Sequence, residues 1–197
     1  MKKSILFLIV VLSNLLLSCD KNNIELPSNL DFKQFVDLLN LSKSTVKSKV
    51  KGTLKTEINT PGNFCLIYLY KTLECEYYID LKFTKDDRLS SVRIIDVDSK
   101  SKTYSDGINF YKVLSDRIDN YGRWVSYSGY DYGTYSFNIR TDYWNYLVNH
   151  SVKYSTAEIW TIKNKVKEDT KLITETVRLI FFKSDNKCNV IIDRIEI

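Results

Sequence analysis

The chain contains one histidine, His150, and therefore one ordinary imidazole that could act as a general base. A Ser-His-Asp or Cys-His site would have to include it, yet its neighbours Asn149 and Ser151 form no nucleophile motif. One imidazole also cannot supply a transition-metal site built from several histidines. Neither common glycine-rich phosphate-binding motif occurs in the 197 residues. We therefore expect no catalytic residue, no cofactor and no bound metal.

Carboxylates occur in two close groups that could in principle serve a glycosidase. Such an enzyme needs two carboxylates facing each other across a cleft, and the candidates are Asp86 with Asp87 and Glu74 with Glu76. The aspartates fall in a predicted turn, where aspartate is favoured because it hydrogen bonds to the local backbone. A glycan-processing enzyme is therefore the third of three functional interpretations, after two that involve binding alone.

Four cysteines are present, and their spacing argues against a metal knuckle. Cys19, Cys65, Cys75 and Cys188 include no C-x-x-C pair. Cys65 and Cys75 could be joined by a disulfide if the protein is exported. The favoured interpretation is that they are small core residues in strands.

The N-terminal residues have the organisation of a secretory signal peptide. A basic start, Met1-Lys2-Lys3, precedes the apolar stretch Ile5 to Leu12, and a small residue, Ser18, precedes Cys19. A membrane-spanning helix needs about 20 apolar residues. The stretch from Ser4 to Leu17 is shorter than that and is interrupted by Asn14, so export is the favoured interpretation.

The last four residues of this segment, Leu16-Leu17-Ser18-Cys19, resemble the lipobox of bacterial lipoproteins. The resemblance implies cleavage before Cys19, a diacylglyceryl group on its thiol and acylation of the new amino group. Each buried CH₂ contributes about 0.8 kcal/mol, so two or three acyl chains anchor a protein stably. The expected location is the cell envelope on a bacterial membrane, with the outer membrane favoured and lipid on Cys19 as the membrane contact.

This anchor divides the chain into a signal peptide at 1–18, a polar tether at 19–28 and one α+β domain at 29–197, with possible subunits 29–100 and 101–197. Removing the two lysines of the signal peptide leaves 27 basic residues against 24 acidic ones. This balance argues against a nucleic-acid partner. The abundance of Lys, Asn, Ile and Tyr is similar to that of lipoproteins from Bacteroidota.

Hydrophobic periodicity predicts an antiparallel sheet with two helices, an α+β fold. The expected elements are a helix from Ser28 to about Leu41, a basic connection at 42–52, a strand at 64–70, a hairpin at 79–97, a helix at 106–120 capped by Ser105, an aromatic β region at 124–146, a strand at 157–162 and a hairpin formed by 174–182 and 188–197.

The first hairpin is specified in most detail. Alternation predicts that Leu81 pairs with Val92, Ile79 with Ile94, Asp80 with Arg93 and Thr84 with Leu89. Residues 79–97 align with 177–195 at an offset of 98 with six identities in 19 positions. The two hairpins are either copies in tandem helix-plus-hairpin units or two independent amphipathic hairpins.

Tandem helix-plus-sheet units of this kind resemble small envelope lipoproteins and inhibitors of the β-lactamase-inhibitor-like group. An immunity or inhibitor lipoprotein, which would block a toxin or an enzyme at the membrane, is the alternative to a general binding module.

Aromatic residues gather in one part of the chain. Residues 121–146 contain ten of the 26 aromatic side chains. Packing within a sheet explains such a cluster, and so does a surface that binds a protein or a glycan. Along a continuous strand the rings would point to both faces. The candidate partner-binding residues are Trp124, Tyr127, Tyr130, Tyr132 and Tyr135.

Overall fold

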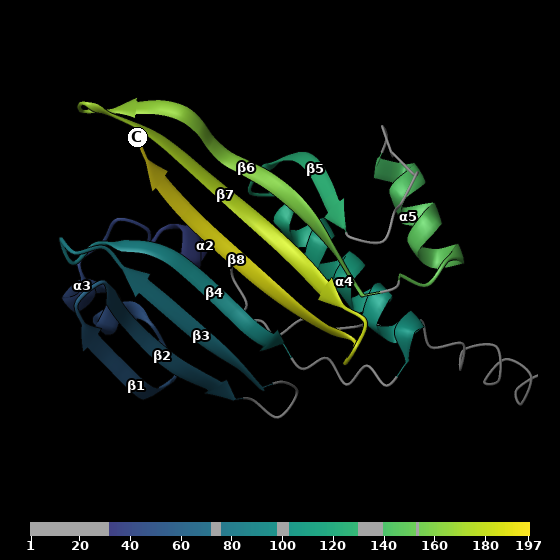
Figure 1. The fold of residues 1–197 in the computed structure, drawn as a ribbon, viewed down its shortest axis with the longest axis horizontal. Coiled ribbons are helices and arrows are strands. Elements are labelled where there is room, and N and C mark those ends of the chain that lie inside the picture. The colour runs from purple at the N-terminus through teal and green to yellow at the C-terminus, as the bar shows by residue number, and fades with distance from the viewer. Residues whose placement is uncertain (1–31, 72–75, 98–102, 130–139, 153) are drawn as a thin grey trace, which may run out of the picture.

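A computed structural model of the chain describes residues 32–71, 76–97, 103–129, 140–152 and 154–197, and it has the expected α+β fold (Figure 1). The helices are α2 (Phe32–Val36), α3 (Lys43–Lys49), α4 (Tyr104–Ile118) and α5 (Arg140–Asn149). The strands are β1 (Thr53–Thr60), β2 (Asn63–Lys71), β3 (Glu76–Phe83), β4 (Leu89–Val97), β5 (Arg123–Gly129), β6 (Ser155–Glu168), β7 (Lys171–Phe182) and β8 (Lys187–Glu196).

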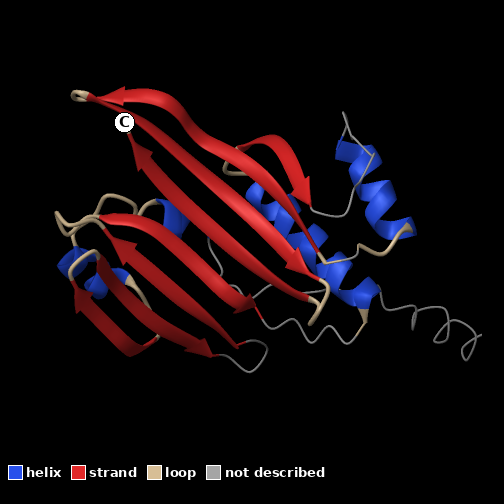
Figure 2. Ribbon diagram, in the orientation of Figure 1, coloured by secondary structure: helices blue, strands red, loops and turns tan. Residues whose placement is uncertain are grey.

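The eight strands form one antiparallel sheet in the order β1-β2-β3-β4-β8-β7-β6-β5 (Figure 2). Two four-stranded meanders therefore meet at the β4–β8 pair, and the same strand order runs outward from that pair on each side. Arg93 of β4 pairs with Ile191 of β8, which is its counterpart at the offset of 98. An approximate two-fold axis through this pair would relate the two halves of the sheet.

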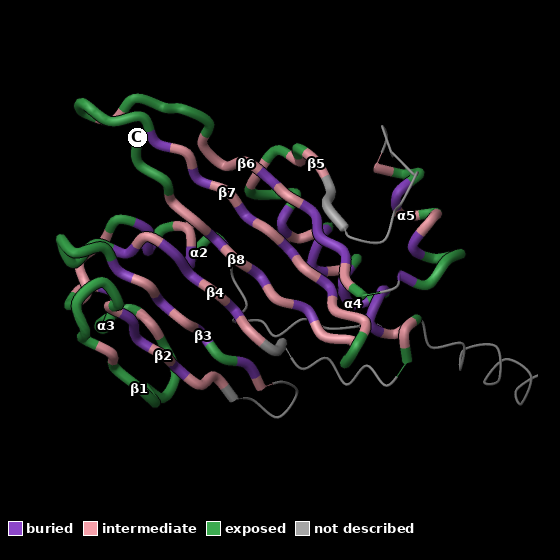
Figure 3. Tube along the Cα trace, in the orientation of Figure 1, coloured by how far each residue is buried: buried purple, intermediate pink, exposed green. Residues whose placement is uncertain are grey.

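One face of the sheet is the core face. A row of directly paired residues crosses six strands on this face, and each is at most 1% exposed: Leu66, Leu81, Val92, Ile192, Val177 and Trp160. The helices pack Phe32, Val46 and Leu114 into the same cluster. Figure 3 shows the resulting alternation of buried and partly exposed residues along the central strands.

Helix α4 begins two residues earlier than the sequence predicts. Thr103, and not Ser105, is the N-cap, and it forms a reciprocal capping box with Asp106. The predicted helix at 106–120 is otherwise present. Gly107 lets this helix approach the β7–β8 hairpin closely, because a Cβ there would lie 2.8 Å from the Phe181 ring.

The N-terminal helical region differs more from the prediction. Helix α2 ends at Val36, and turns lead to Asn40, whose φ of 64° is left-handed and ends any helical continuation. Residues 43–49, predicted as a connection, form α3, with Ser42 as the N-cap. The sequence does not predict this helix, because Val46 is its only buried residue and one apolar residue gives no helical periodicity.

The predicted aromatic β region, 124–146, is correct at its start and wrong at its end, and residues 130–139 lie outside the described residues. Residues 123–129 form β5, whereas residues 140–149 form α5, so the strand prediction for 140–146 is wrong. In this helix Tyr143 and Leu147 are buried at an i, i+4 spacing and α5 packs against α4. The aromatic content predicts a strand. A helix forms instead because it places Tyr143 and Leu147 on one buried face.

Both predicted hairpins form. Leu81 pairs with Val92, Ile79 with Ile94 and Asp80 with Arg93, as expected. The predicted pairing of Thr84 with Leu89 is wrong, since Leu89 pairs with Phe83 across a bulge.

The turn explains this one-residue shift. Asp87 is left-handed, with φ of 61°, and its N–H donates to the Thr84 carbonyl. The Thr84 N–H donates to the Arg88 carbonyl, so Thr84 belongs to the turn and is not part of the strand pairing. Cys65 and Cys188 are buried free thiols, so the core interpretation holds for both, while Cys75 lies outside the described residues.

Candidate functional site

The second face of the sheet, called the open face below, has no helix of the described residues packed on it (Figure 2). A row of directly paired residues crosses this face: Ile67, Asp80, Arg93, Ile191, Arg178 and Ile159. A flanking group of the same parity consists of Leu69, Tyr78, Ile95 and Ile180. These ten residues define the open face.

Every residue of the open face is partly or fully exposed, in contrast to the core row. Tyr78 has 39% of its surface accessible. Isoleucines lie beside Asp80, Arg93 and Arg178 across the strands, so the face is neither a plain apolar patch nor an ordinary charged surface. Aromatic and arginine side chains among aliphatic ones are the composition typical of protein interfaces.

Two polar atoms on this face are buried without a hydrogen-bond partner. They are Oδ1 of Asp80 and Nε of Arg93, from residues that pair directly across β3 and β4. Buried polar atoms are nearly always paired in folded proteins, and leaving one unpaired costs about 1–3 kcal/mol. A bound molecule that offers a donor and an acceptor here would remove that cost. Burial, and next the charge of Asp80, raise the pKa of the adjacent Cys65 thiol, which keeps it protonated.

Arg178 is held in place on the open face by its neighbours. Its guanidinium donates to the Asp193 carboxylate at 2.8 Å, and the Ser91 hydroxyl donates to the same carboxylate at 2.6 Å. The arginine side chain is still 43% exposed. A partner would therefore meet a positioned cation, with little side-chain entropy left to lose.

The core face carries a second polar cluster, centred on Glu158 of β6. This carboxylate is fully buried and accepts hydrogen bonds from Ser115 Oγ at 2.6 Å, Arg140 Nε at 2.8 Å and Trp124 Nε1 at 3.1 Å. Burial raises the pKa of the Glu158 carboxyl, and the bonds from Ser115 and Arg140 oppose that rise. All its described contacts are to protein groups, so the cluster joins α4, α5, β5 and β6.

Asp119 completes this cluster at the end of α4. Its carboxylate accepts from the Arg140 guanidinium and, at 2.6 Å, from Trp160 Nε1. The Arg140 guanidinium also lies 5.6 Å from the Trp160 ring centroid, a cation–π distance. The charged groups and the indole N–H groups of this cluster are hydrogen bonded to one another. We therefore interpret the cluster as structural.

The predicted partner-binding residues are only partly described. Trp124 is half-buried and donates to Glu158, so the fold itself holds its ring. Tyr127 belongs to β5 and pairs with Glu158 in the ladder. Tyr130, Tyr132, Tyr135 and the lipid-attachment residue Cys19 lie outside the described residues. Partner binding by these tyrosines and by Trp124 stays a prediction.

Of the residues that the sequence offers for catalysis, Glu74 lies outside the described residues, and His150 lies on a different element from Asp86 and Asp87. His150 is exposed at the end of α5 and stacks on Tyr146 with ring centroids 4.7 Å apart. Asp86 and Asp87 are exposed in the β3–β4 turn, as the turn interpretation predicts. Among the described residues, no three His, Cys, Asp or Glu side chains are grouped as metal ligands. The part of the chain that the structure describes also contains no helix able to cross a membrane.

Sequence reasoning missed the open face and the Glu158 cluster for different reasons. The alternation at residues 77–83 and 174–182 shows which side chains share a face, but not which face the helices cover. Arg140, Glu158 and Asp119 come from separate elements, and no local pattern links them. Comparison with protein-family models, curated proteins and solved structures finds no match to this chain.

Proposed function

We propose that this protein is a non-catalytic, lipid-anchored lipoprotein of the bacterial cell envelope whose open face binds a protein partner. The observation that carries the proposal is the open face itself. It places partly exposed isoleucines beside Arg93, Arg178 and Tyr78, with two polar atoms left unpaired.

The dimensions of the face fit a protein better than a small ligand. The ten residues of the open face lie on six strands about 4.8 Å apart, so the face is about 24 Å wide from β2 to β6. An extended surface of this width suits a protein interface, to which each partner contributes about 800 Å² in complexes of ordinary size. The face is an extended surface, so a glycan, whose sugars stack on individual rings, is the less favoured ligand.

Site-specific photo-crosslinking in cells tests the binding face. A photoreactive residue at Ile191 or Arg178 should give the same adduct, whereas one at Asn109, exposed on α4, should give none. Arg178→Glu and Arg93→Glu should abolish the Ile191 adduct while the circular dichroism spectrum is unchanged. An adduct that forms equally from Asn109 would contradict the proposal.

The anchor is tested separately. The resemblance of Leu16–Cys19 to a lipobox supports lipid on Cys19. Cells fed an alkyne-labelled fatty acid should label the wild type and the Cys65→Ala control, and should not label Cys19→Ala. Labelling of Cys19→Ala together with unchanged membrane association would remove this part of the proposal.

An inhibitor or immunity role is the second candidate. The two four-stranded meanders that flank β4 and β8 support it, because they form tandem helix-plus-sheet units like those of the inhibitor group that the sequence resembles. The crosslinked partner identifies the role. A toxin or enzyme whose activity falls to zero at a one-to-one ratio would favour inhibition, and one with unchanged activity would favour the general binding role.

The tyrosine-rich segment is proposed as an extension of the binding surface. It follows β5, an edge strand of the sheet, and precedes α5. Tyr130→Ala and Tyr132→Ala should weaken partner binding without lowering the melting temperature. A fall in melting temperature with unchanged binding would assign these rings to packing.

A further inference from the structure

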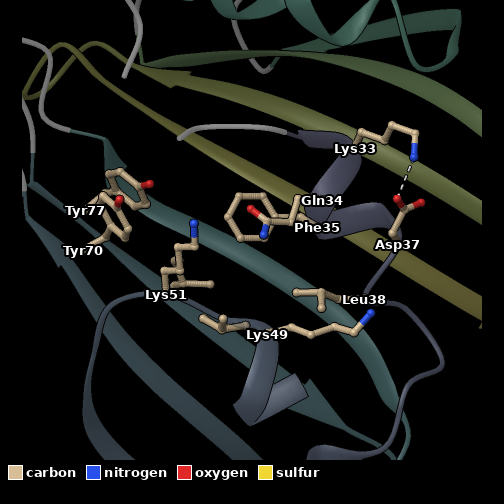
Figure 4. A pocket seen from close by; sticks show the side chains of 11 residues that line it. Lys33, Gln34, Phe35, Asp37, Leu38, Lys49, Lys51, Tyr70 and Tyr77 are labelled. Carbon is tan, nitrogen blue, oxygen red and sulfur yellow. Dashed lines mark hydrogen bonds and ion pairs between the residues drawn. The ribbon is translucent and has the colours of Figure 1, made fainter. Parts of the chain in front are cut away.

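A pocket of about 690 Å³ lies at the N-terminal end of the fold, on the core side of the sheet, away from the open face (Figure 4). Its walls come from α2 with the turn after it, from the end of α3 and from strands β2 and β3. Helix α2 is five residues long and α3 seven, so together they leave part of this sheet uncovered.

The lining of the pocket combines aromatic and aliphatic side chains with lysines, and Asp37 is its one acidic residue. Tyr70 and Tyr77 stack with ring centroids 5.0 Å apart, and Phe35 lies across from them. Lys51 extends between the tyrosine pair and Phe35 in Figure 4, and Lys49 lies farther along the lining. Rings beside lysines suit an anionic amphiphile, which offers both a phosphate and acyl carbons.

The lysines differ in what they contact. Lys33 pairs with Asp37 at 2.7 Å, and Lys43 and Lys47 of α3 pair with Glu57. Lys49 and Lys51 are exposed and form no ion pair with any described residue. Two lysines of the pocket lining are therefore available to an external anion.

The proposed anchor places a membrane within reach. Twelve residues, 20–31, separate Cys19 from α2. Fully extended, they span at most about 40 Å, so α2 stays within about that distance of the bilayer surface and can reach it. Anionic headgroups attract basic surface segments that lie within about one Debye length of them.

We infer that this pocket binds the headgroup of an anionic phospholipid in the bilayer that holds the lipid on Cys19, an inference that rests on the proposed anchor. The phosphate pairs with Lys51, Lys49 attracts it from farther along the lining, and the glycerol and upper acyl carbons contact Phe35 and the tyrosine pair. Headgroup binding holds the α2 side of the domain toward the membrane and leaves the open face available to a partner.

Lysine footprinting on the lipidated full-length protein in vesicles tests this inference. Acetylation by an amine-reactive ester is followed by mass spectrometry, in vesicles of phosphatidylcholine with or without phosphatidylglycerol. Lys49 and Lys51 should react about fivefold more slowly when phosphatidylglycerol is present. Lys165 and Lys167, exposed near the β6–β7 turn, should react equally in both.

A matched pair of variants sharpens the test. In Lys49→Gln the protection of Lys51 should fall, because the phosphate loses one cation, whereas Lys165→Gln should leave it unchanged. Protection by inorganic phosphate in phosphatidylcholine vesicles would assign the pocket to free phosphate and overturn the lipid assignment. Equal reactivity in both vesicles also overturns it.

Flotation of the vesicles separates this inference from the anchor. Protein that floats with both vesicle types but shows no protection overturns headgroup binding alone. Protein that does not float overturns the anchor, and headgroup binding with it.

Discussion

The two halves of the sheet have the same strand order but fill their core faces differently. In the N-terminal half, α2, α3 and β1–β4, the one buried polar residue described is Ser91, and its parity with Arg93 places it on the open face. In the C-terminal half, α4, α5 and β5–β8, Ser115, Thr156, Glu158 and Glu175 are all buried. At the offset of 98, Tyr77 of β3 corresponds to Glu175 of β7.

The contrast shows that the same strand topology can carry an aromatic residue or a charged residue at corresponding positions of its two halves. Tyr77 stacks on Tyr70 beside an open pocket, whereas Glu175 pairs with Arg194 at 2.7 Å. The 15 residues of α4 cover more of the sheet than the two short N-terminal helices. In the C-terminal half, buried carboxylates thus pair with arginines inside the fold. In the N-terminal half, the pocket lysines are left to pair with an external anion.

The largest expected effect is on the charge cluster of the C-terminal half. Glu158→Ala should lower the free energy of unfolding by about 3–5 kcal/mol, because it leaves Arg140 partly buried without this partner. Urea unfolding followed by circular dichroism measures it. The control is Asp116→Ala, which removes an exposed pair with Lys112 and should cost at most about 0.5 kcal/mol. Similar costs for the two variants would show that the cluster is not structural.

Matched truncations in the two halves come next. Leu81→Ala and Leu179→Ala each remove a fully buried side chain and should each cost about 2–5 kcal/mol. All three tryptophans, at 124, 144 and 160, belong to the C-terminal half, so their fluorescence reports on that half alone.

The fluorescence readout tests whether the halves unfold together. Because β4 pairs with β8, Leu81→Ala should shift the fluorescence transition as far as the circular dichroism transition. A fluorescence midpoint that stays at the wild-type value would mean that the halves unfold separately.

Helix caps give a smaller effect. Thr103→Ala removes a capping box from α4 and should cost about 1 kcal/mol. Ser42→Ala should cost less, because its bond to the Thr45 N–H is 3.4 Å long and α3 buries only Val46. Thermal unfolding of both variants compares them directly. A larger cost for Ser42→Ala would reverse the expected ranking of the two helices.

The smallest effect is a pH dependence at Glu168. Hydrogen bonds from Lys163 and then Arg194 lower the pKa of the Glu168 carboxyl from 4.5 to about 2. A lowered folded-state pKa gives stability that is present above pH 4.5 and is lost as the pH falls toward 2. Glu168→Gln should therefore make the decline in urea midpoint between those pH values shallower. An unchanged decline would show that Glu168 does not contribute to it.

The sequence predicted what depends on local alternation. The register of Leu81 with Val92 follows from period-two patterning, because a slip by one residue would turn the whole apolar set to solvent. The pairing of Thr84 could not be read in the same way, since it depends on the left-handed backbone of Asp87. Helix α3 could not be predicted, because one buried residue gives no hydrophobic periodicity.

The candidate sites depend on contacts between distant segments, and for that reason they were the least predictable. Asp80 opposite Arg93 was predicted, but that this pair lies on a helix-free face was not. The Glu158 cluster joins residues from four separate elements, and the pocket exists because two helices are short. The composition of the sequence pointed to the tyrosines of residues 121–146 as candidate binding residues. It did not point to the lysines of α3.

The central position of β8 has a consequence for the order in which the protein folds. Strand β4 must wait for its neighbour β8, the last of the described strands in chain order, and its free edge stays exposed during synthesis until then. Pairing across such a sequence distance is slow, because the loop must close before any contact forms. The N-terminal meander therefore completes its sheet only after β8 has been synthesised, and until then its unpaired edge can form contacts between chains that lead to aggregation.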